Sequence, residues 1–327
     1  MHTSFVLFHI ANNAISMYYR KKRRESSPLH RIEIEKEKVR SMNEYKQTGY
    51  LNGNFKVFHL NDEAKQDIDF HYHDFHKILI FLKGNISYCI EGRNYDLSPN
   101  DIVFVHAGEV HRPIWQDASP YERIIIYISR EFLGAYQQEN NDLGLCLKQA
   151  HENQSHVLRV PAFHSTKLGN VIKELEASFH STEYANELYH DILFLEFMVQ
   201  LNRAVIREGV EYIATSSANP KIISIIDYIN AHLSEDLTID RISETFYLNR
   251  YYLMHTFKEE TGYTIGHYLT TKRLLMAKEL IDGGMPATEA CYECGFRNYS
   301  TFYRAYKKNF NATPTGESAM NALQEYS

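Results

Sequence analysis

Two hydrophobic patterns divide the chain. Across residues 55–128, short runs rich in branched and aromatic residues are separated by the turn signals LKGN, EGRN and SPND. This pattern is typical of strands in an antiparallel barrel or sandwich. From residue 161 onward, apolar residues recur at intervals of three and four, the period of an α-helix. We therefore predict an α+β chain of two domains, with a small antiparallel β-barrel and its following helices first and an all-α domain second.

Residues 165–180 and 183–208 are predicted to be helices. The second has a broad apolar stripe made of Leu188, Ile192, Leu195, Val199, Ala204 and Val205, widened by Phe194, Phe197 and Met198. A stripe of this width either packs on the barrel of the same chain or pairs with a second copy. Of these alternatives we favour the homodimer.

The last hundred residues contain the same arrangement twice. The segments TIDRISETFYLNRYYLMHTFKEETG and PATEACYECGFRNYSTFYRAYKKNF each predict a short helix, a tight turn and a second helix. Tandem helix-turn-helix units place two recognition helices into neighbouring parts of a DNA major groove. Double-stranded DNA is therefore the predicted partner.

Each second helix has one apolar face and one polar or aromatic face. Phe302, Tyr306 and Phe310 fall at i, i+4 and i+8 and are predicted to be buried, as are Leu253 and Phe257 in the first unit, where Asn249 is placed as the N-cap. The outward-facing residues are Tyr251, Met254, His255 and Lys258 in the first unit, and Ser300, Tyr303, Arg304 and Lys307 in the second.

The two units are joined by IGHYLTTKRLLMAKELIDGG, which predicts a helix ended by Gly283 and Gly284 and followed by Pro286. At 1.5 Å per residue this helix spans roughly 27 Å. One turn of B-DNA is about 34 Å. A rod of this length can hold both reading helices against one side of the duplex.

Residues 220–316 resemble the DNA-binding domain of the AraC/XylS family of transcription regulators. The similarity lies in FKEETGYTIGHYLTTKRLLMAKELI and ACYECGFRNYSTFYRAYKKNFNATP. The resemblance implies that the residues facing base edges are Arg250, Tyr251, Met254, His255, Tyr299, Ser300, Tyr303 and Arg304. It further implies phosphate contacts by Lys258, Lys307 and Lys308, and it makes RNA polymerase a candidate partner.

Charge in this domain is uneven. From residue 219 to the end there are 11 Lys and Arg against 13 Asp and Glu, although a DNA-binding domain is commonly basic. Residues 295–314 nevertheless contain Arg297, Arg304, Lys307 and Lys308 and no acid. The second unit is therefore predicted to supply most of the phosphate binding and to make it strongly salt-dependent.

In the β-rich half, HYHDFHK at residues 71–77 and HAGEVH at residues 106–111 resemble the two motifs of the cupin family, here as a sensor domain. Small-molecule pockets combine aromatic side chains with a few polar groups. A carbohydrate-like effector is the predicted ligand, because sugar faces stack on rings and sugar hydroxyls pair with imidazoles. The predicted ligand-binding residues are His71, Tyr72, His73, Lys77, Tyr88, His111 and Trp115.

A metal site is the weaker alternative for the same region. The resemblance implies that His71, His73 and His111 correspond to metal ligands, while Lys77 stands where a metal-binding cupin has a glutamate. An ammonium group repels a metal ion and offers no lone pair. We therefore predict no metal and no cofactor, although three neutral imidazoles could still coordinate zinc.

The remaining sequence features favour a cytoplasmic protein. The chain of 327 residues has a formal charge of −6, and its four cysteines show no disulfide framework. Cys291 and Cys294 form a CxxC without a second pair, so we predict that they pack in the core. Residues 5–19 are largely apolar and precede RKKRR, but they are too short for a membrane span. Weak membrane association remains the alternative there.

The predicted domains are an extension (1–45), with Met42 as a candidate functional start, a cupin-like sensor (46–160), a helical dimerisation or packing segment (161–210), a linker (211–219) and a DNA-binding domain (220–327). The predicted function is sequence-specific regulation of transcription in response to a small molecule. The competing hypothesis is a metal-dependent cupin enzyme with a helical interaction module. Lys77 and the lack of a nucleophile–base pattern favour the regulator.

Overall fold

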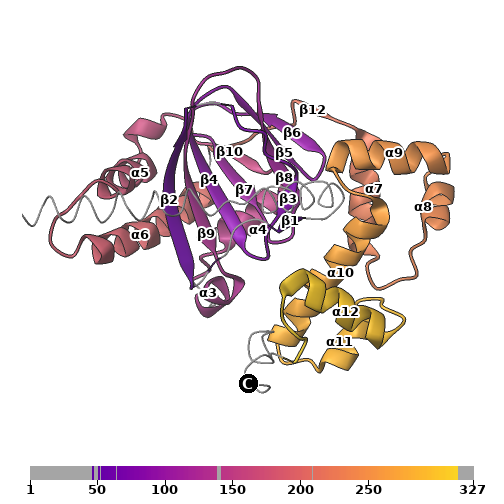
Figure 1. The fold of residues 1–327 in the computed structure, drawn as a ribbon. Coiled ribbons are helices and arrows are strands. Elements are labelled where there is room, and N and C mark those ends of the chain that lie inside the picture. Colours follow the sequence, from indigo (N-terminus) through magenta and orange to yellow (C-terminus); the bar gives the residue numbers. More distant parts are fainter. Residues whose placement is uncertain are drawn as a thin grey trace, which may run out of the picture. The chain divides into compact units, whose positions relative to one another are not determined.

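Two six-stranded sheets make up the first part of the computed structural model, which describes residues 46–47, 51, 53–63, 65–137, 141–207 and 209–315 (Figure 1). One sheet has the order β1 (Lys46–Gln47), β3 (His71–Tyr72), β8 (His111–Trp115), β5 (Ile86–Ile90), β6 (Arg93–Asp96) and β12 (Ser217–Ala218). The other has the order β11 (Glu211–Tyr212), β10 (Val157–Arg159), β7 (Ile102–Val105), β4 (His76–Lys83), β9 (Tyr121–Ile128) and β2 (Phe55–Asp62). Strands β1 and β3 pair in parallel, and the other described pairs with a stated register are antiparallel.

Alternation along the central strands separates two cores. In β4, Leu79 and Phe81 pack with Tyr88 and Trp115 of the opposite sheet, in a core between the two sheets. Ile78 and its neighbours of the same parity lie on the outer face of the sheet in a second core. Because successive strand residues point to opposite faces, a strand that is buried on both faces reads as a continuous apolar run. This explains the sequence KILIFL.

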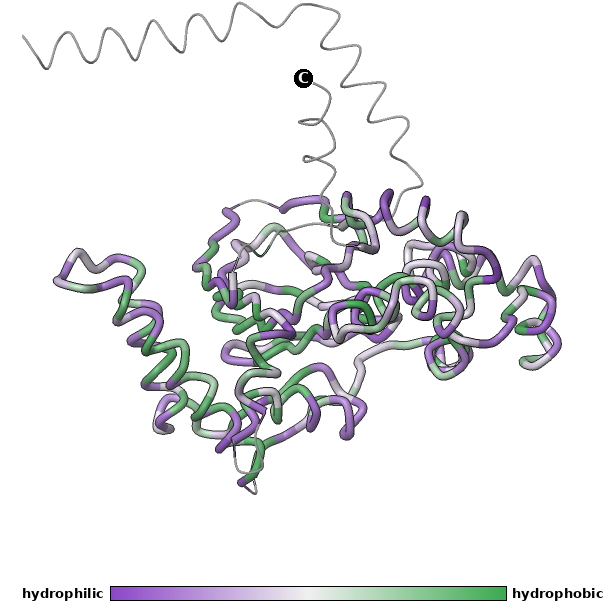
Figure 2. Tube along the Cα trace, turned by 90° about the horizontal axis from the view of Figure 1, so that it is seen from below, coloured by the Kyte–Doolittle hydropathy of each residue, from purple (hydrophilic) through white to green (hydrophobic). Residues whose placement is uncertain are grey.

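Helices cover the outer face of the second sheet. They are α3 (Arg130–Ala135), α4 (Leu145–Glu152), the 3₁₀ turn η1 (Phe163–Ser165), α5 (Lys167–Ser178) and α6 (Asn186–Ile206). Figure 2 shows apolar positions recurring along α5 and α6, at the left of the view. Phe194, Phe197 and Met198 of α6 are fully buried against the sheet. The two predicted helices at 165–180 and 183–208 are confirmed, with slightly shorter limits.

The predicted combination of an antiparallel β-fold with helices is confirmed, but the strands do not close into a barrel. Each sheet is a linear series that begins and ends in a strand with one partner, such as β2, which pairs only with β9 among the described strands. Closure would require the end strands to hydrogen-bond to each other. Among the described residues the arrangement is therefore a sandwich.

The second part of the structure is all helical. It contains α7 (Pro220–Ala231), α8 (Ile239–Thr245), α9 (Arg250–Thr261), α10 (Ile265–Asp282), α11 (Ala287–Glu293) and α12 (Tyr299–Phe310). The predicted N-cap Asn249 accepts hydrogen bonds from the backbone N–H groups of Tyr251 and Tyr252. Thr238, Thr264 and Asn298 cap α8, α10 and α12 in the same way. These caps satisfy backbone donors that have no partner within the helix.

The second helix-turn-helix unit is built on a compact apolar cluster. Phe302 and Tyr306 of α12 are 0 % and 4 % exposed and pack with Cys291 and Cys294 of α11. The predicted packing of the CxxC pair in the core is confirmed, since both thiols are free and buried. Gly295 makes the turn between α11 and α12 with a φ of +78°. In the first unit, Tyr247 occupies the comparable turn with a φ of +51°.

The predicted linker at 211–219 carries two short strands. β11 pairs with β10 and β12 pairs with β6, so each of the two sheets gains one edge strand from it. Within the described part of the chain, no helix is long and apolar enough to cross a membrane. The apolar segment 5–19, the basic RKKRR and Met42 lie outside the described residues.

Candidate functional site

The first predicted reading helix, α9, presents its candidate residues to solvent. Arg250, Tyr251, Met254, His255 and Lys258 are all exposed, and Tyr251 is 74 % exposed. The opposite side of α9 is buried through Leu253 and Phe257. The outward face also carries acid, because His255 Nδ1 lies 3.2 Å from a carboxylate oxygen of Glu259. Arg250 is paired with Asp240 at 2.9 Å.

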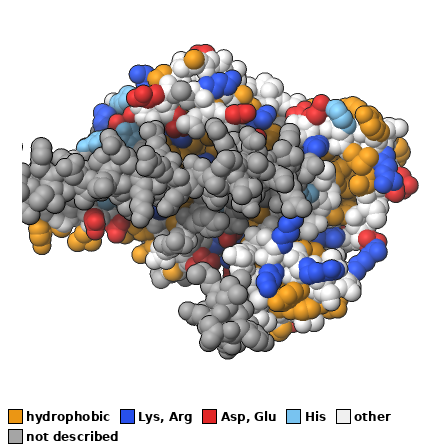
Figure 3. Space-filling view, viewed as in Figure 1, with side chains coloured by type: hydrophobic (Ala, Val, Ile, Leu, Met, Phe, Trp, Pro, Cys, Tyr) orange, Lys and Arg blue, Asp and Glu red, His pale blue; other side chains and the backbone are white. Residues whose placement is uncertain are grey.

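The second predicted reading helix, α12, is more basic. Ser300, Arg304, Lys307 and Lys308 are exposed, whereas Tyr299 and Tyr303 are half-buried. Arg304 Nε donates to the Ser300 carbonyl at 3.2 Å, which leaves the guanidinium face in solvent. Figure 3 shows Lys and Arg side chains gathered at the lower right, in the region of α12. The structure thus supports the expected asymmetry between the two helices.

Inside the sandwich, three imidazoles surround a lysine. His71, His73 and His111 come from or adjoin the paired strands β3 and β8, and their nearest ring nitrogens lie within 4.8 Å of one another. Lys77 of β4 donates to the Tyr88 hydroxyl at 2.9 Å and lies 3.5 Å from His111 Nε2. All five side chains are buried. The structure therefore brings together five of the seven predicted ligand-binding residues. These five, His71, His73, Lys77, Tyr88 and His111, form the inner cluster.

Burial determines the protonation of the inner cluster. Removal from water, reinforced by the Lys77 charge, lowers the pKa of His71 to about 4. Burial also holds the pKa values of His73 and His111 well below their ordinary range, reinforced by Lys77 and then His71 for His73, and by His71 and then Lys77 for His111. Burial and then the nearby Arg123 lower the pKa of Lys77 to about 7. The imidazoles are therefore neutral and able to accept hydrogen bonds at physiological pH.

A metal does not fit this donor set well. His111 Nδ1 donates to the Glu109 carbonyl at 2.9 Å, so its only lone pair is on Nε2, and that nitrogen faces Lys77. The Lys77 amine is buried with the imidazoles, in the position where the cupin resemblance implies a glutamate ligand, and as an ammonium group it repels a metal ion. These contacts support the prediction of a metal-free pocket.

Several buried polar atoms between the two sheets have no hydrogen-bond partner in the described structure. They are His73 Nδ1, Trp115 Nε1, the Tyr121 hydroxyl and Arg123 Nε. Buried polar groups are normally paired, because leaving one unpaired costs about 1–3 kcal/mol. Their strands β8 and β9 contribute to the same inner core as Tyr88. Polar atoms of a ligand are natural partners for such groups.

Tyr72 lies apart from the inner cluster. Because neighbouring strand residues point in opposite directions, its side chain is on the other face from those of His71 and His73. Its hydroxyl donates to the side-chain oxygen of Asn309 in α12, at 2.9 Å. Trp115 is on the inner face of β8, stacked edge to face with Tyr121 at 5.3 Å between ring centroids. It shares the inter-sheet core with Tyr88.

Sequence reasoning did not identify Arg123 as a pocket residue. It is 6 % exposed, and its guanidinium group is paired with Asp62 at 2.7 Å and lies over the Tyr121 ring. A charged residue at an inward position of the apolar run ERIIIYI was the available signal. Arg123 is a second cation on the inner face of the same sheet as Lys77, and its charge contributes to the lowered pKa of that lysine.

The sensor and the helical domain belong to one structural unit from Lys46 onward. Glu91, at the β5–β6 turn, accepts from the Tyr268 hydroxyl at 2.5 Å and from Lys272 Nζ at 2.8 Å. Lys272 also donates to the carbonyl of Gly108 at 2.9 Å. Both Tyr268 and Lys272 lie on α10, the helix between the two helix-turn-helix units. The β-sandwich is thus in direct polar contact with the DNA-binding helices.

Two helix-turn-helix units joined to a sandwich that encloses a polar cluster define a DNA-binding transcription regulator with a ligand-binding domain. Residues 242–317 match the helix-turn-helix domain family and residues 57–193 match the AraC-like ligand binding domain family. The chain belongs to the AraC family of transcription regulators.

Curated relatives agree with this assignment. The chain is 25 % identical to the HTH-type transcriptional activator RhaS of Salmonella schwarzengrund over 75 % of this chain and 85 % of that protein. It is 23 % identical to RhaS of Shigella sonnei, over 76 % and 86 %. Among solved structures, ToxT from Vibrio cholerae aligns at 15 % identity over 81 % of this chain and 96 % of that chain, with a TM-score of 0.35.

Proposed function

We propose that this regulator responds to a sugar or a related polyhydroxyl metabolite bound at the inner cluster. The observation that carries the proposal is the set of unpaired buried polar atoms between the sheets, beside neutral imidazoles and aromatic rings. Hydroxyl groups both donate and accept, so a polyhydroxyl ligand can pair with imidazole, indole and phenol groups at once. Lys77 and Arg123 favour members of this class that carry an acidic group, such as sugar acids.

The proposed route from ligand to DNA runs through the contact between Glu91 and α10. Lys272 joins Glu91 and the Gly108 carbonyl, and both belong to turns that adjoin strands of the inner cluster. A ligand that prefers one arrangement of these turns would shift the population of α10 positions, and with it the spacing of the two reading helices. The effect depends on unequal affinity for the two arrangements.

The DNA-binding role of individual residues is part of the proposal. The exposed polar face of α12 supports Ser300 and Arg304 as base-reading residues, with Lys307 and Lys308 at phosphates. On α9, Tyr251 and Met254 favour apolar contacts with thymine methyl groups, while Arg250, His255 and Lys258 complete the surface. Tyr299 and Tyr303 are half-buried, so they would act mainly by supporting the helix and lining the groove.

A metal-dependent enzyme is the competing function. The relatives of this chain named above are transcription activators. In addition, the contact between Lys77 and His111 disfavours the metal that such an enzyme needs. We infer a non-enzymatic, cytoplasmic regulator with RNA polymerase as a candidate partner. Stoichiometric iron or manganese in the inner cluster, together with turnover of a substrate, would reverse this inference.

The effector proposal predicts a specific thermal shift. A panel of monosaccharides and sugar acids is added to the full chain, and the unfolding temperature is measured. A ligand at 100 times its Kd stabilises by about 2.7 kcal/mol, equivalent to roughly 5 to 10 °C for a domain of this size. Lys77→Met should abolish the shift. Lys83→Met, at the exposed end of the same strand, is the matched control and should retain it.

The same pair of variants gives a pH test without ligand. Below pH 7, Lys77 is charged in both folded and unfolded chains, and the folded chain bears the cost of burying the charge. As the pH rises above about 7, the folded chain releases the proton while the unfolded chain keeps it up to its ordinary pKa near ~10.5. Stability due to this group therefore increases with pH, and Lys77→Met should stabilise most below pH 7. In the thermal-shift experiment, a ligand that raises the unfolding temperature of Lys77→Met as much as that of the wild type would contradict the proposed site.

Homodimerisation through α6 is proposed on its second apolar face. Leu188 and Ile192 are 60 % and 50 % exposed, and Val199 continues the same stripe at 37 %. The buried face of α6 already packs on the sheet, so this stripe is available for another copy. Ile192→Asp is expected to convert dimer to monomer in light scattering after size exclusion, because a desolvated carboxylate opposes association. Lys173→Glu on neighbouring α5 should leave the dimer intact. A wild-type monomer at all concentrations would refute this interface.

A further inference from the structure

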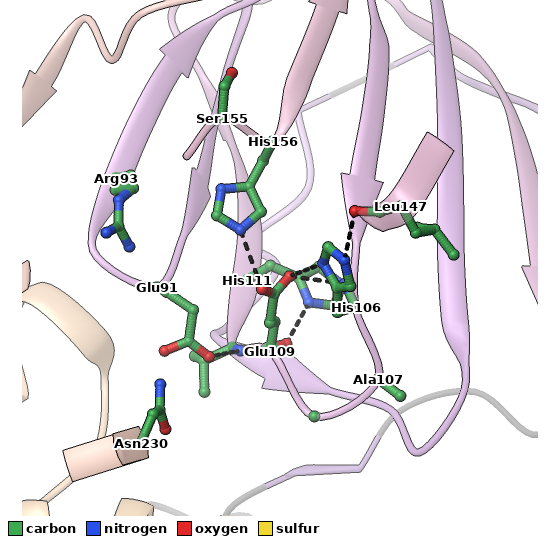
Figure 4. A network of polar contacts seen from close by, with 12 residues as sticks. Glu91, Arg93, His106, Ala107, Glu109, His111, Leu147, Ser155, His156 and Asn230 are labelled. Carbon is green, nitrogen blue, oxygen red and sulfur yellow. Dashed lines mark hydrogen bonds and ion pairs between the residues drawn. The ribbon is translucent and has the colours of Figure 1, made fainter. Parts of the chain in front are cut away.

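A second group of ionisable side chains lies outside the inner cluster. Glu109, in the loop between β7 and β8, is placed between two histidines (Figure 4). Its carboxylate oxygens lie 3.1 Å from His156 Nε2 and 3.4 Å from His106 Nδ1. His156 immediately precedes β10, so the group joins two segments that are distant in sequence. The potential ligand atoms of all three residues lie within 4.8 Å of one another.

The outer nitrogen of each imidazole is held by a hydrogen bond. His106 Nε2 is 3.1 Å from the Leu147 carbonyl, which can only accept, so this nitrogen carries a proton. In a neutral His106 the lone pair is therefore on Nδ1, directed toward the Glu109 carboxylate. His156 Nδ1 lies 3.1 Å from the Tyr95 hydroxyl. Imidazoles that bind metals are typically oriented in this way by a partner on the second nitrogen.

The distances suit a small cation between the three side chains. Bonds of about 2.0–2.1 Å in tetrahedral geometry place neighbouring ligand atoms about 3.3 Å apart. Each imidazole lies close to this distance from one carboxylate oxygen, His156 Nε2 from Oε1 at 3.1 Å and His106 Nδ1 from Oε2 at 3.4 Å. The same Glu109 oxygen that faces His106 Nδ1 also accepts from the His106 backbone N–H at 2.7 Å. Against the opposing effect of burial, the Glu109 charge raises the pKa of His106, so a metal ion would displace a proton from Nδ1 when it binds.

The group is accessible from solvent. Glu109 and His156 line a cavity of about 550 Å³, together with His151 and Gln154. The side chains of His106, Glu109 and His156 are 22 %, 16 % and 12 % exposed. An ion can therefore enter, and water can fill a fourth ligand position.

We propose that His106 Nδ1, His156 Nε2 and the Glu109 carboxylate form a binding site for a divalent transition metal ion, with Zn²⁺ as the preferred ion. Two imidazoles and one carboxylate suit zinc, whereas Ca²⁺ and Mg²⁺ require oxygen ligands. Unlike the inner cluster, this group contains a carboxylate, and Lys272, which lines the same cavity, is ion-paired with Glu91 at 2.8 Å. A bound ion would clamp the β7–β8 loop to the start of β10.

The test uses the full chain after treatment with a chelator. Zn²⁺ affinity is measured by competition with a chromophoric chelator, and Co²⁺ serves as a spectroscopic probe of tetrahedral coordination. The wild type should bind tightly, with intense visible Co²⁺ bands and a higher unfolding temperature in Zn²⁺. His156→Gln and Glu109→Gln should each lower the Zn²⁺ affinity by more than about 100-fold. This is more than the loss expected when a residue that only hydrogen-bonds to a metal ligand is replaced.

Two other histidine groups provide the controls. His59 lies near Glu122 and Glu176, and His71 belongs to the inner cluster. His59→Gln and His71→Gln should retain tight Zn²⁺ binding and the Co²⁺ bands. The proposal fails if the wild type binds Zn²⁺ no more tightly than about 1 mM, or if binding is lost in His71→Gln or His59→Gln and kept in His156→Gln. The unfolding temperature of each variant, measured in the presence of chelator, identifies any variant that is misfolded. If one of His156→Gln and Glu109→Gln is misfolded, the other is sufficient for the test.

Discussion

Replacing Gly295 by alanine is expected to destabilise the helical domain by about 2–5 kcal/mol, the sum of a left-handed backbone penalty and steric crowding. The residue has a φ of +78°, and an added Cβ would lie 2.6 Å from the Leu233 carbonyl oxygen and 2.9 Å from that of Ser234. The Leu233 carbonyl also accepts from Arg273 Nε at 2.8 Å. Crowding there would disturb the α7–α8 loop as well as the second turn. Denaturant unfolding measures the loss, and DNA affinity should fall with it.

Gly266→Ala is the matched control for this change. Gly266 lies in α10, and an added Cβ would meet no atom within 4 Å apart from its own helix and its neighbours. Alanine in a helix is favoured over glycine by about 0.5–1 kcal/mol, so this variant should be neutral or more stable. Equal effects of the two substitutions would show that the turn at Gly295 does not require glycine.

Arg304→Ala is expected to weaken binding to a selected DNA site by about 1–3 kcal/mol, a factor of roughly 5 to 150. The guanidinium group is on the exposed face of α12 and can form two parallel hydrogen bonds to a guanine edge. Duplexes selected from a random pool by wild type and variant should differ in preference at one base-pair position. Arg304→Lys retains the charge but not the paired geometry, so it should restore affinity for random DNA more than affinity for the selected site.

Lys307→Ala separates base reading from phosphate binding. Lys307 is exposed one turn nearer the C-terminal end of α12, where a lysine acts as a point charge toward phosphate. Its loss should weaken selected and random duplexes alike and reduce the salt slope by about 1. If Arg304→Ala and Lys307→Ala have the same small effect on both kinds of duplex, direct reading by Arg304 is excluded.

Much of the helical domain follows from the sequence because its determinants are local. Asn249 caps α9, Gly295 makes the second turn, and the spacing of Phe302 and Tyr306 assigns the buried face of α12. Capping, glycine turns and helical periodicity act within a few residues. Most exposed residues of both reading helices could therefore be predicted before any packing was known, whereas Tyr299 and Tyr303 are half-buried against the domain.

The β-sandwich depends more on contacts that are remote in sequence. The short runs across residues 55–128 predict β2, β4, β5, β6, β7 and β9. They do not predict β3 and β8, which are short and rich in histidine, arginine and proline. Their pairing at His71 and His111 is what assembles the inner cluster. Strand alternation could have placed Tyr72 away from His71 and His73, but only if the strand itself had been predicted.

By itself, the sequence determined the tandem reading helices, their caps, their buried faces and the concentration of basic residues on the second unit. Only the tertiary structure decided that the sheets form a sandwich, that Arg123 is buried on the same inner face as Lys77, and that Glu109 meets His156 47 positions away. It also decided that Tyr247 adopts a φ of +51°, a conformation that tyrosine disfavours on its own. Local patterns encode short-range geometry, whereas these features arise where segments distant in the chain are packed together and stabilise one another.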